Sequence, residues 1–479
     1  MRSLLVTRRP AVSNFFSRFL HSLGQNGHCT DPPLGLREIC DAVSRSVGGL
    51  DELQSSLDHQ FRAHLTSLLV GQVVDHCESE APARRILRFF LWSRRVLGLE
   101  LRNEVFNNVV RVVAKKKDRV GVEMLLVEMA KDGREMEPRT FGVVASALVR
   151  MGREDEALGI FKNLERFKCE RDGQAVAAIV SALCEKGHAK KAQGVVRHHK
   201  DKVSTLEMAS IYKSVLYGWV ERKDVKEARS VIKEMKGAGI MPDLFCYNTF
   251  LRGLCERNVV HNPSGLVPEA LNVMMEMRSY RIEPNSISYN VLLSCLGRVR
   301  RVKEACRVLE LMKSASCKPD WVSYYLVARV LYLSGRFGKG NKIVDEMIDQ
   351  GIVPEPRFYH DLVGVLCGVD RASFALELLD RMKRTSSGGY GPVYDILIPK
   401  FCRGGEFDKG KELWDEATAM GVTLSYSSDV SDPSVTEVFK PTRKVDEEEV
   451  KHVGFTKVVN TPVIGGRMMR NSKKRRGSL

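Results

Sequence analysis

Two stretches of the sequence carry residue types and spacings used in catalysis, but each lacks a residue that the chemistry requires. Residues 405–411 (GEFDKGK) have the spacing of a phosphate-binding loop, yet Glu412 stands where Ser or Thr must bind magnesium, and no strand precedes them. We interpret this stretch as a turn between two helices. His76 and Glu78 form the His-x-Glu of zinc deaminases, but the Pro-Cys-x-x-Cys ligand pair is absent. Serine-nucleophile elbows and His-Glu-x-x-His helices are absent too, so we expect a protein that is not an enzyme and needs no cofactor or metal.

The cysteines also lack a catalytic or metal-binding pattern. The chain has 12 of them, scattered through apolar stretches, and Cys-x-x-Cys never occurs. This usage is typical of buried thiols in a reducing compartment. We expect Cys184, Cys255, Cys367 and Cys402, which recur at one position of the repeat described next, to be packing residues.

A period of 35 residues is the strongest signal in the sequence. Methionine recurs every 35 residues at 277, 312, 347 and 382, and proline recurs at the same interval at 284, 319 and 354. A small residue opens an apolar helical run at a similar spacing, as Ala157, Ala192, Ala228, Ala270, Ala305 and Ala375. Three markers in one phase indicate a true repeat.

Each repeat predicts a pair of helices. Residues 244–258 (LFCYNTFLRGLCERN) have apolar residues at helical spacing, and 302–316 (VKEACRVLELMKSAS) form the second helical run of another unit. A break such as GIMPD (239–243) closes a unit, because proline lacks an amide hydrogen and disfavours a helical predecessor. The small residue lets the two helices approach closely, while Met and Leu fill the seam. Such hairpins stack along the chain into a solenoid, each contacting its neighbours only.

These units resemble the pentatricopeptide repeat family, P-class, whose units start Val-Val-Thr-Tyr-Asn and end Pro-Asp. The resemblance covers nine units over 103–425, with one extra residue in the third and seven in the fifth. The predicted boundaries are 103–137, 138–172, 173–208, 209–243, 244–285, 286–320, 321–355, 356–390 and 391–425. Residues 31–102 are predicted to be an N-terminal helical region with a degenerate repeat at about 68–102. The tetratricopeptide family, with a period of about 34 residues, is the nearest competitor, but the regular 35-residue spacing and the Tyr-Asn pairs argue against it.

The resemblance implies an all-α fold, a right-handed superhelical α-solenoid whose first helices line a concave groove for single-stranded RNA. Such repeats read one base per unit. In the family the fifth and last residues of a unit contact the base edge, and apolar second residues of adjacent units sandwich its ring. The predicted base-specifying pairs are Asn248 with Asn285, favouring a pyrimidine, and Asn290 with Asp320, favouring uracil. The predicted packing residues are Phe245, Ile287 and Val322. Because the family reads RNA with the 5′ end towards the protein N-terminus, the expected core is 5′-C/U-U-3′.

The other seven units fit the family pattern poorly. Their fifth and last residues are Asn107/Glu137, Gly142/Asp172, Ala177/Met208, Lys213/Asp243, Tyr325/Glu355, His360/Tyr390 and Asp395/Ser425. Two reading pairs specify little sequence, which raises the alternatives of a structural subunit of the mitochondrial ribosome or a protein-binding scaffold. Asn248 and Asn290 also have a simpler interpretation as helix-start residues that satisfy backbone amides.

The charge is concentrated at the two ends. Of the formal net charge of +16, residues 1–30 carry +4 and residues 450–479 carry +8, both without an acid, which leaves +4 for the 419 residues between. Residues 1–30, rich in Arg and able to form an amphipathic helix, are predicted to be a mitochondrial transit peptide, with the chloroplast as the alternative. Residues 426–479 are predicted to be a flexible basic tail. Its Lys473, Lys474, Arg475 and Arg476 either attract RNA or solubilise the end.

No stretch has the roughly 18 uninterrupted apolar residues that a membrane-spanning helix needs, so no membrane partner is expected. The sequence therefore predicts a monomeric organellar RNA-binding protein that acts in transcript processing, stability, splicing or translation.

Overall fold

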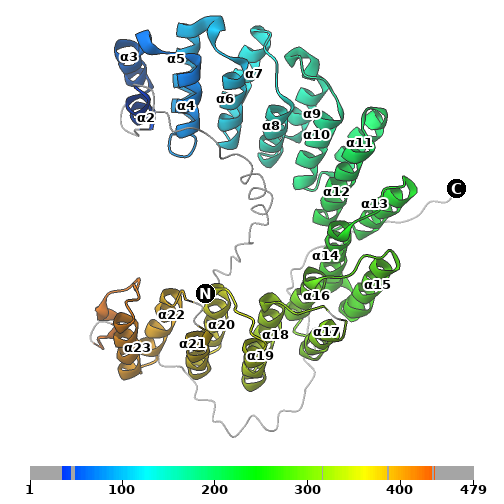
Figure 1. Cartoon of the computed structure of the whole chain (residues 1–479), viewed down its shortest axis with the longest axis vertical. Helices are drawn as coiled ribbons and strands as arrows, with labels where there is room; N and C mark the ends of the chain where they lie inside the picture. Colours follow the sequence, from blue (N-terminus) through cyan, green and yellow to red (C-terminus); the bar gives the residue numbers. More distant parts are fainter. Residues whose placement is uncertain (1–34, 45–48, 316, 386–387, 434–435, 437–479) are drawn as a thin grey trace, which may run out of the picture. The chain divides into compact units, whose positions relative to one another are not determined.

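The computed structural model describes residues 35–44, 49–315, 317–385, 388–433 and 436, and every regular element in these ranges is a helix (Figure 1). The predicted transit peptide (1–30) and the basic run 473–476 lie outside the described residues. Among the described helices, none combines the length and the apolar character needed to cross a bilayer.

Each of the nine predicted units contains a helical hairpin. Eight of the nine residues predicted to open a unit are the first residues of helices. These first helices are α6 (Asn103–Lys115), α8 (Pro138–Arg150), α10 (Gly173–Glu185), α12 (Thr205–Glu221), α14 (Leu244–His261), α16 (Ser286–Arg298), α18 (Trp321–Leu333), α20 (Pro356–Gly368) and α22 (Gly391–Arg403). The second helices are α7 (Arg119–Lys131), α9 (Glu154–Lys162), α11 (Ala189–His199), α13 (Val225–Gly237), α15 (Leu266–Ser279), α17 (Val302–Ser314), α19 (Phe337–Asp349), α21 (Ala372–Thr385) and α23 (Phe407–Ala419).

Packing follows the order of the chain, as expected for an α-solenoid. The chain divides into two compact units, Met1–Ile352 and Val353–Leu479. In the first, α6, α8, α10, α12, α14, α16 and α18 form a row in which each helix contacts the next, and each second helix packs on its own first helix. The second repeats this pattern with α20, α21, α22 and α23. Each hairpin therefore buries its apolar faces on its sequence neighbours.

Local signals fix where the first helices begin. The last residue of several units is an N-cap whose side chain accepts a hydrogen bond from a backbone N–H of the following helix, as Asp172, Asp243, Asn285 and Asp320 do. Such a cap satisfies one of the amide hydrogens that the first turn leaves unpaired. The unit boundary is thus also the start of the next first helix.

The same turn joins the two helices in eight of the nine hairpins, the fifth being the exception. A residue with left-handed backbone follows the first helix, for example Gly152 (φ 77°), Gly187 (φ 75°) and Gly405 (φ 86°). Gly405 lies between α22 and α23, and Gly410 packs against Cys402, where an added Cβ would lie 2.3 Å from Sγ. Residues 405–411 therefore form the predicted hairpin turn and the start of α23.

The seam between the helices of a hairpin is packed as the sequence predicts. The recurring alanines, from Ala157 to Ala375, are at most 1% exposed, and Met277, Met312, Met347 and Met382 are fully buried. The alanine series skips one unit, where Gly340 takes its place; a Cβ there would lie 2.2 Å from the Tyr332 ring. The four cysteines predicted to be packing residues are also buried.

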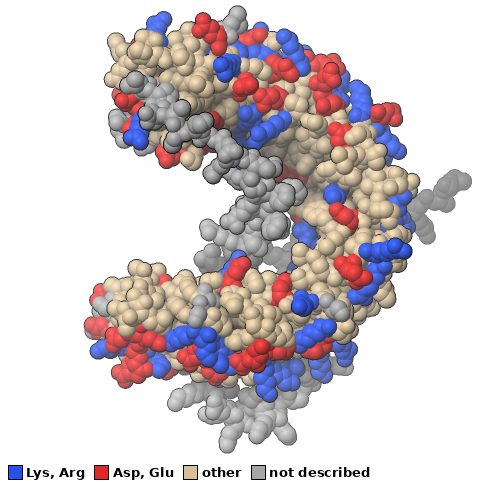
Figure 2. Space-filling view, viewed as in Figure 1, with Lys and Arg blue, Asp and Glu red and all other residues tan. Residues whose placement is uncertain are grey.

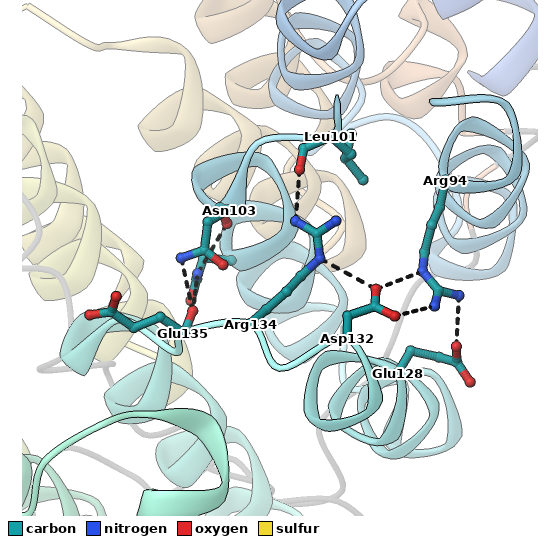
Figure 3. Close-up of polar contacts among 8 residues, drawn as sticks. Arg94, Leu101, Asn103, Glu128, Asp132, Arg134 and Glu135 are labelled. Carbon is teal, nitrogen blue, oxygen red and sulfur yellow. Dashed lines mark hydrogen bonds and ion pairs between the residues drawn. The ribbon is translucent and has the colours of Figure 1, made fainter. Parts of the chain in front are cut away.

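Two further hairpins precede the first predicted unit: α2 (Leu36–Ser44) with α3 (Leu50–Gln60), and α4 (Ser67–His76) with α5 (Ala83–Leu97). Arg94 on α5 binds Asp132 at 2.8 Å and Glu128 at 2.6 Å, while Arg134 binds Asp132 at 3.3 Å and donates to the Leu101 carbonyl at 2.7 Å (Figure 3). This network ties the α4–α5 hairpin to the first predicted unit.

The structure departs from the sequence-based boundaries at three places. Helix α12 begins at Thr205, four residues before Ala209, because Ser204 and Glu207 form a capping box that adds a turn. In the fifth unit the seven extra residues lengthen α14 and form the 3₁₀ helix η5 (Pro263–Gly265). Directly after residue 425, the 3₁₀ helix η6 (Ser428–Ser431) packs on α22 and α23.

Candidate functional site

Asn290 and Asp320, a predicted base-specifying pair, lie in direct contact; we call them the Ser286 pair, after the first residue of their unit. Asn290 is the fifth residue of α16 and Asp320 is the N-cap of α18, so the packing of these helices brings them together. Asn290 Nδ2 donates to Asp320 Oδ1 at 3.0 Å. Asn290 Oδ1 accepts from the hydroxyl of Ser323 at 2.7 Å.

Asn248 and Asn285, the Leu244 pair, have the same arrangement one unit earlier. Asn248 Nδ2 donates to Oδ1 of Asn285, the N-cap of α16, at 3.3 Å. The hydroxyl of Ser288 donates to Asn248 Oδ1 at 2.6 Å. The two pairs are therefore structural equivalents on neighbouring helices.

Each pair leaves hydrogen-bonding capacity unused. A side-chain amide carries two N–H donors and two oxygen lone pairs. Asn290 Nδ2 also lies 3.3 Å from the other oxygen of the same Asp320 carboxylate, a contact that the same N–H can serve. In Asn248 and in Asn290 these contacts engage one N–H and one oxygen lone pair, so one donor and one acceptor remain. Both side chains are half-buried, not enclosed. The arrangement can therefore offer an adjacent donor and acceptor to a ligand.

Asp320 is held in its charged form. Burial by itself would raise the pKa of its carboxyl, but hydrogen bonds from Asn290, from the Ser323 backbone and from the Ser323 hydroxyl outweigh burial and hold the pKa below its ordinary value. The Ser286 pair therefore presents a carboxylate, whereas the Leu244 pair presents a neutral amide in the same place. This difference is the chemical distinction between the two pairs.

Two of the three predicted packing residues are exposed, although they are apolar. Phe245 is 47% exposed and Ile287 is 57% exposed, and each is the second residue of its helix; Val322, in the same position of α18, is half-buried. Exposing large apolar side chains costs free energy, on the order of 25 cal/mol per Å² of surface left in water. Phe245 and Ile287 are thus surfaces available for stacking against a flat ligand.

The helix-start interpretation of Asn248 and Asn290 is wrong. Both lie at the fifth position, inside α14 and α16, and the N-caps are Asp243 and Asn285. The side chains of these two N-caps accept hydrogen bonds from the backbone N–H groups of Cys246 and Ser288.

Ser288 and Ser323 join the members of the two pairs, and the sequence interpretation missed them. Both are fully buried, and each is the third residue of its helix, where it bridges the fifth residue of the preceding unit and the N-cap. The signal was present, because a serine stands three residues after the last residue of each reading pair, as Asn285-x-x-Ser288 and Asp320-x-x-Ser323. This is the spacing of a capping box, which places the hydroxyl at the helix start.

Fifth and last residues also meet in three units that fit the family pattern poorly. Asp395 accepts from the backbone N–H of Ser425 at 2.9 Å, and Lys213 forms an ion pair with Asp243 at 2.7 Å. In the first unit Asn107 is fully buried and its amide is engaged by the backbone: Nδ2 donates to the Glu135 carbonyl, and Oδ1 accepts from the Glu137 N–H. Figure 3 shows Asn103 beside the same Glu135 carbonyl. Asn107 therefore has a structural role.

Two of the other units cannot form such a pair. Gly142 has no side chain, and Met208, the last residue of its unit, is buried. His360 contacts its neighbour Asp361 at 3.1 Å.

The near-neutral body predicted from the sequence agrees with the visible surface, on which basic and acidic side chains are interspersed (Figure 2). The described residues contain no group of three or more His, Cys, Asp or Glu side chains that could hold a metal.

Family models match several of these units. A PPR repeat family model matches residues 209–256 and 284–331, a pentatricopeptide repeat domain matches 267–299, and a PPR repeat matches 139–169. The matched segments include all of α16 and most of α14 and α18. They therefore cover both predicted reading pairs.

Relatives extend the match to most of the chain. A mitochondrial pentatricopeptide repeat-containing protein of Arabidopsis thaliana is 57% identical over 412 residues, which is 86% of this chain and 84% of that protein. The small ribosomal subunit protein mL104 (rPPR9) of Arabidopsis thaliana is 26% identical over 454 residues, 93% of this chain and 85% of that protein.

The solved structure of the pentatricopeptide repeat protein PPR10 from maize has the same fold, with a TM-score of 0.50 at 20% identity. The match covers 83% of this chain, which spans 60% of the PPR10 chain. Together with the relative that is 57% identical, the fold and the repeat identify the chain as a member of the pentatricopeptide repeat family, and its compartment as the mitochondrion.

Proposed function

We propose that this protein binds single-stranded mitochondrial RNA along its row of first helices, and that it acts in the processing, stability, splicing or translation of a transcript. The Leu244 pair reads a pyrimidine and the Ser286 pair reads uracil, so the bound core is 5′-C/U-U-3′. Phe245, Ile287 and Val322 pack against the faces of the two bases. The basic run 473–476 adds electrostatic attraction for the phosphates.

One observation carries this proposal. Asn248 and Asn290 each keep one donor and one acceptor unused, at equivalent places in neighbouring units, next to an exposed apolar side chain. A pyrimidine edge carries donors and acceptors side by side, and base stacking on a side chain contributes about 1–3 kcal/mol. The carboxylate of Asp320 accepts the N3–H of uracil, whereas cytosine has an acceptor at N3.

Selection from a randomised RNA pool by the full-length protein tests the proposal. We expect enrichment of a pyrimidine followed by uracil. The variant Asn290→Thr should move the preference at the second base from uracil towards guanine, as the family pattern implies, while Ser294→Ala, an exposed serine on the same helix, should leave it unchanged. A pool that shows no preference for the dinucleotide would contradict the proposal.

A second candidate function is that of a structural subunit of the mitochondrial ribosome. The observation that favours it is the similarity to mL104, a small ribosomal subunit protein, over 93% of this chain. Sedimentation of the native protein separates the candidates. Co-migration with ribosomal subunits that survives moderate salt supports the structural role, and its absence argues against it.

A further inference from the structure

The ion pair between Lys213 and Asp243, which we call the Ala209 pair, occupies the place of a reading pair in the unit before the Leu244 pair. Lys213 is the fifth residue of the predicted unit 209–243 and lies within α12. Asp243 is the last residue of that unit and the N-cap of α14. Lys213 Nζ lies 2.7 Å from Asp243 Oδ2, and Oδ1 accepts from the Cys246 N–H at 3.0 Å. This geometry repeats that of Asn290 and Asp320.

The Ala209 pair is accessible to a ligand. The side chains of Lys213 and Asp243 are 39% and 47% exposed. Phe245, 47% exposed, is two residues after Asp243 and separates the Ala209 pair from the Leu244 pair along the chain. A base at the Ala209 pair would therefore share the Phe245 ring with the base at the next pair, and a purine offers the larger face for that contact.

Both members of the pair are charged. The hydrogen bond to Asp243 raises the pKa of the Lys213 ammonium. Burial would raise the pKa of Asp243, but the bond from Lys213 outweighs it and the pKa is lowered. An ammonium has three N–H donors, and a carboxylate has about four lone-pair sites. The ion pair and the cap use one donor and two lone pairs, so donors remain directly beside acceptors.

We propose that the Ala209 pair is a third base-reading position and that it selects guanine. In guanine the acceptor O6 is adjacent to two donors, N1–H and the N2 amine, which match the ammonium and the carboxylate in order. Uracil has one donor, N3–H, and then places its O2 acceptor against the carboxylate. Adenine has its N6 amine, a donor, where guanine has the acceptor O6, and its ring nitrogen N1 is an acceptor where guanine has a donor. Its edge therefore does not match the ammonium and the carboxylate. The predicted site becomes 5′-G-C/U-U-3′, and this inference rests on the proposed function for the order of the bases.

The test uses the full-length protein and RNAs with a fixed pyrimidine–uracil core and randomised nucleotides on both sides. We expect guanine to be preferred about tenfold on the 5′ side, since a good paired contact to a base edge gives about that discrimination. Lys213→Met should reduce the guanine preference, whereas Lys190→Met, which removes an exposed lysine on the second helix α11 with no ion pair among the described residues, should leave that preference unchanged. Inosine in place of guanosine should weaken wild-type binding several-fold, because inosine lacks the N2 amine that would donate a hydrogen bond to Asp243.

The outcomes separate this inference from the proposed function. Selection of the pyrimidine–uracil core without a 5′ guanine overturns the inference alone. A guanine preference on the 3′ side, or one that Lys213→Met leaves intact, also overturns it. Loss of selection for the core itself overturns both.

Discussion

Replacing Ser323 by alanine removes the hydroxyl that joins Asn290 to Asp320 and leaves both of these residues unchanged. Ser323 is fully buried; its Oγ donates to Asn290 Oδ1 at 2.7 Å and accepts from the Asp320 N–H at 3.3 Å. A net hydrogen bond is worth about 0.5–1.5 kcal/mol, so the loss of both contacts should lower the free energy of unfolding by about 1–2 kcal/mol.

The same change should affect base selection. Without the hydroxyl, the Asn290 amide loses the contact to its oxygen and keeps only its donor bond to Asp320, so its orientation towards a base is held less firmly. If that contact is worth about 1 kcal/mol, selectivity for uracil over cytosine should fall about fivefold. Urea unfolding and fluorescence anisotropy with RNAs that differ at one base measure the two effects.

Ser294→Ala is the matched control, because Ser294 is an exposed serine on the neighbouring helix α16. It should be as stable and as selective as the wild type. If Ser323→Ala is destabilised but keeps its selectivity, Ser323 acts only as part of the cap. If it is neither destabilised nor less selective, the bridging role is refuted.

Three further predictions concern the packing and the ionisation of the described residues. Gly218→Ala should lower the free energy of unfolding by about 1–3 kcal/mol, since its Cβ would lie 2.8 Å from Cys184 Sγ, while Gly159→Ala, which meets nothing within 4 Å, should raise it by up to about 1 kcal/mol in the same urea assay. Because its pKa is lowered in the folded state, the Asp320 carboxylate stabilises the protein above about pH 4 and loses this effect as the pH falls further. Lowering the pH from 6 to 3 should therefore reduce the thermal unfolding temperature of the wild type more than that of Asp320→Asn. Equal reductions in the two proteins would contradict the assignment. Burial raises the pKa of the Cys184 thiol to about 12, so iodoacetamide at pH 8 should leave it unlabelled in the native protein and label it in urea, as peptide mapping can show.

Part of the candidate site could be predicted from the sequence because the repeat supplies a register. Once the period is known, Asn248, Asn285, Asn290 and Asp320 fall at fixed positions, and the structure brings each predicted pair together. The bridging serines were not predicted, since a small polar residue at the third position of a helix is equally compatible with an ordinary cap.

The structure was also needed to show whether the fifth and last residues of the poorly fitting units meet and remain accessible. Asn107 has the residue type of a reader, yet its amide is buried and bonded to backbone groups of 135 and 137. Lys213 is not a residue type that the family uses at this position, yet it contacts Asp243 as Asn290 contacts Asp320. Which amide is enclosed and which ion pair is exposed depends on how neighbouring helices pack, and this information is absent from a single repeat.

The sequence by itself determined the helical hairpins, their order and their buried seams, because the 35-residue period places apolar, small and helix-breaking residues in one phase, and each hairpin needs only its neighbours to bury its surface. Only the tertiary structure decided which polar side chains remain available, since that depends on hydrogen bonds between residues about 30 to 40 positions apart, across the contact of adjacent first helices. A fixed period can specify where such residues lie, but the distance and direction between two side chains are set only when the helices pack.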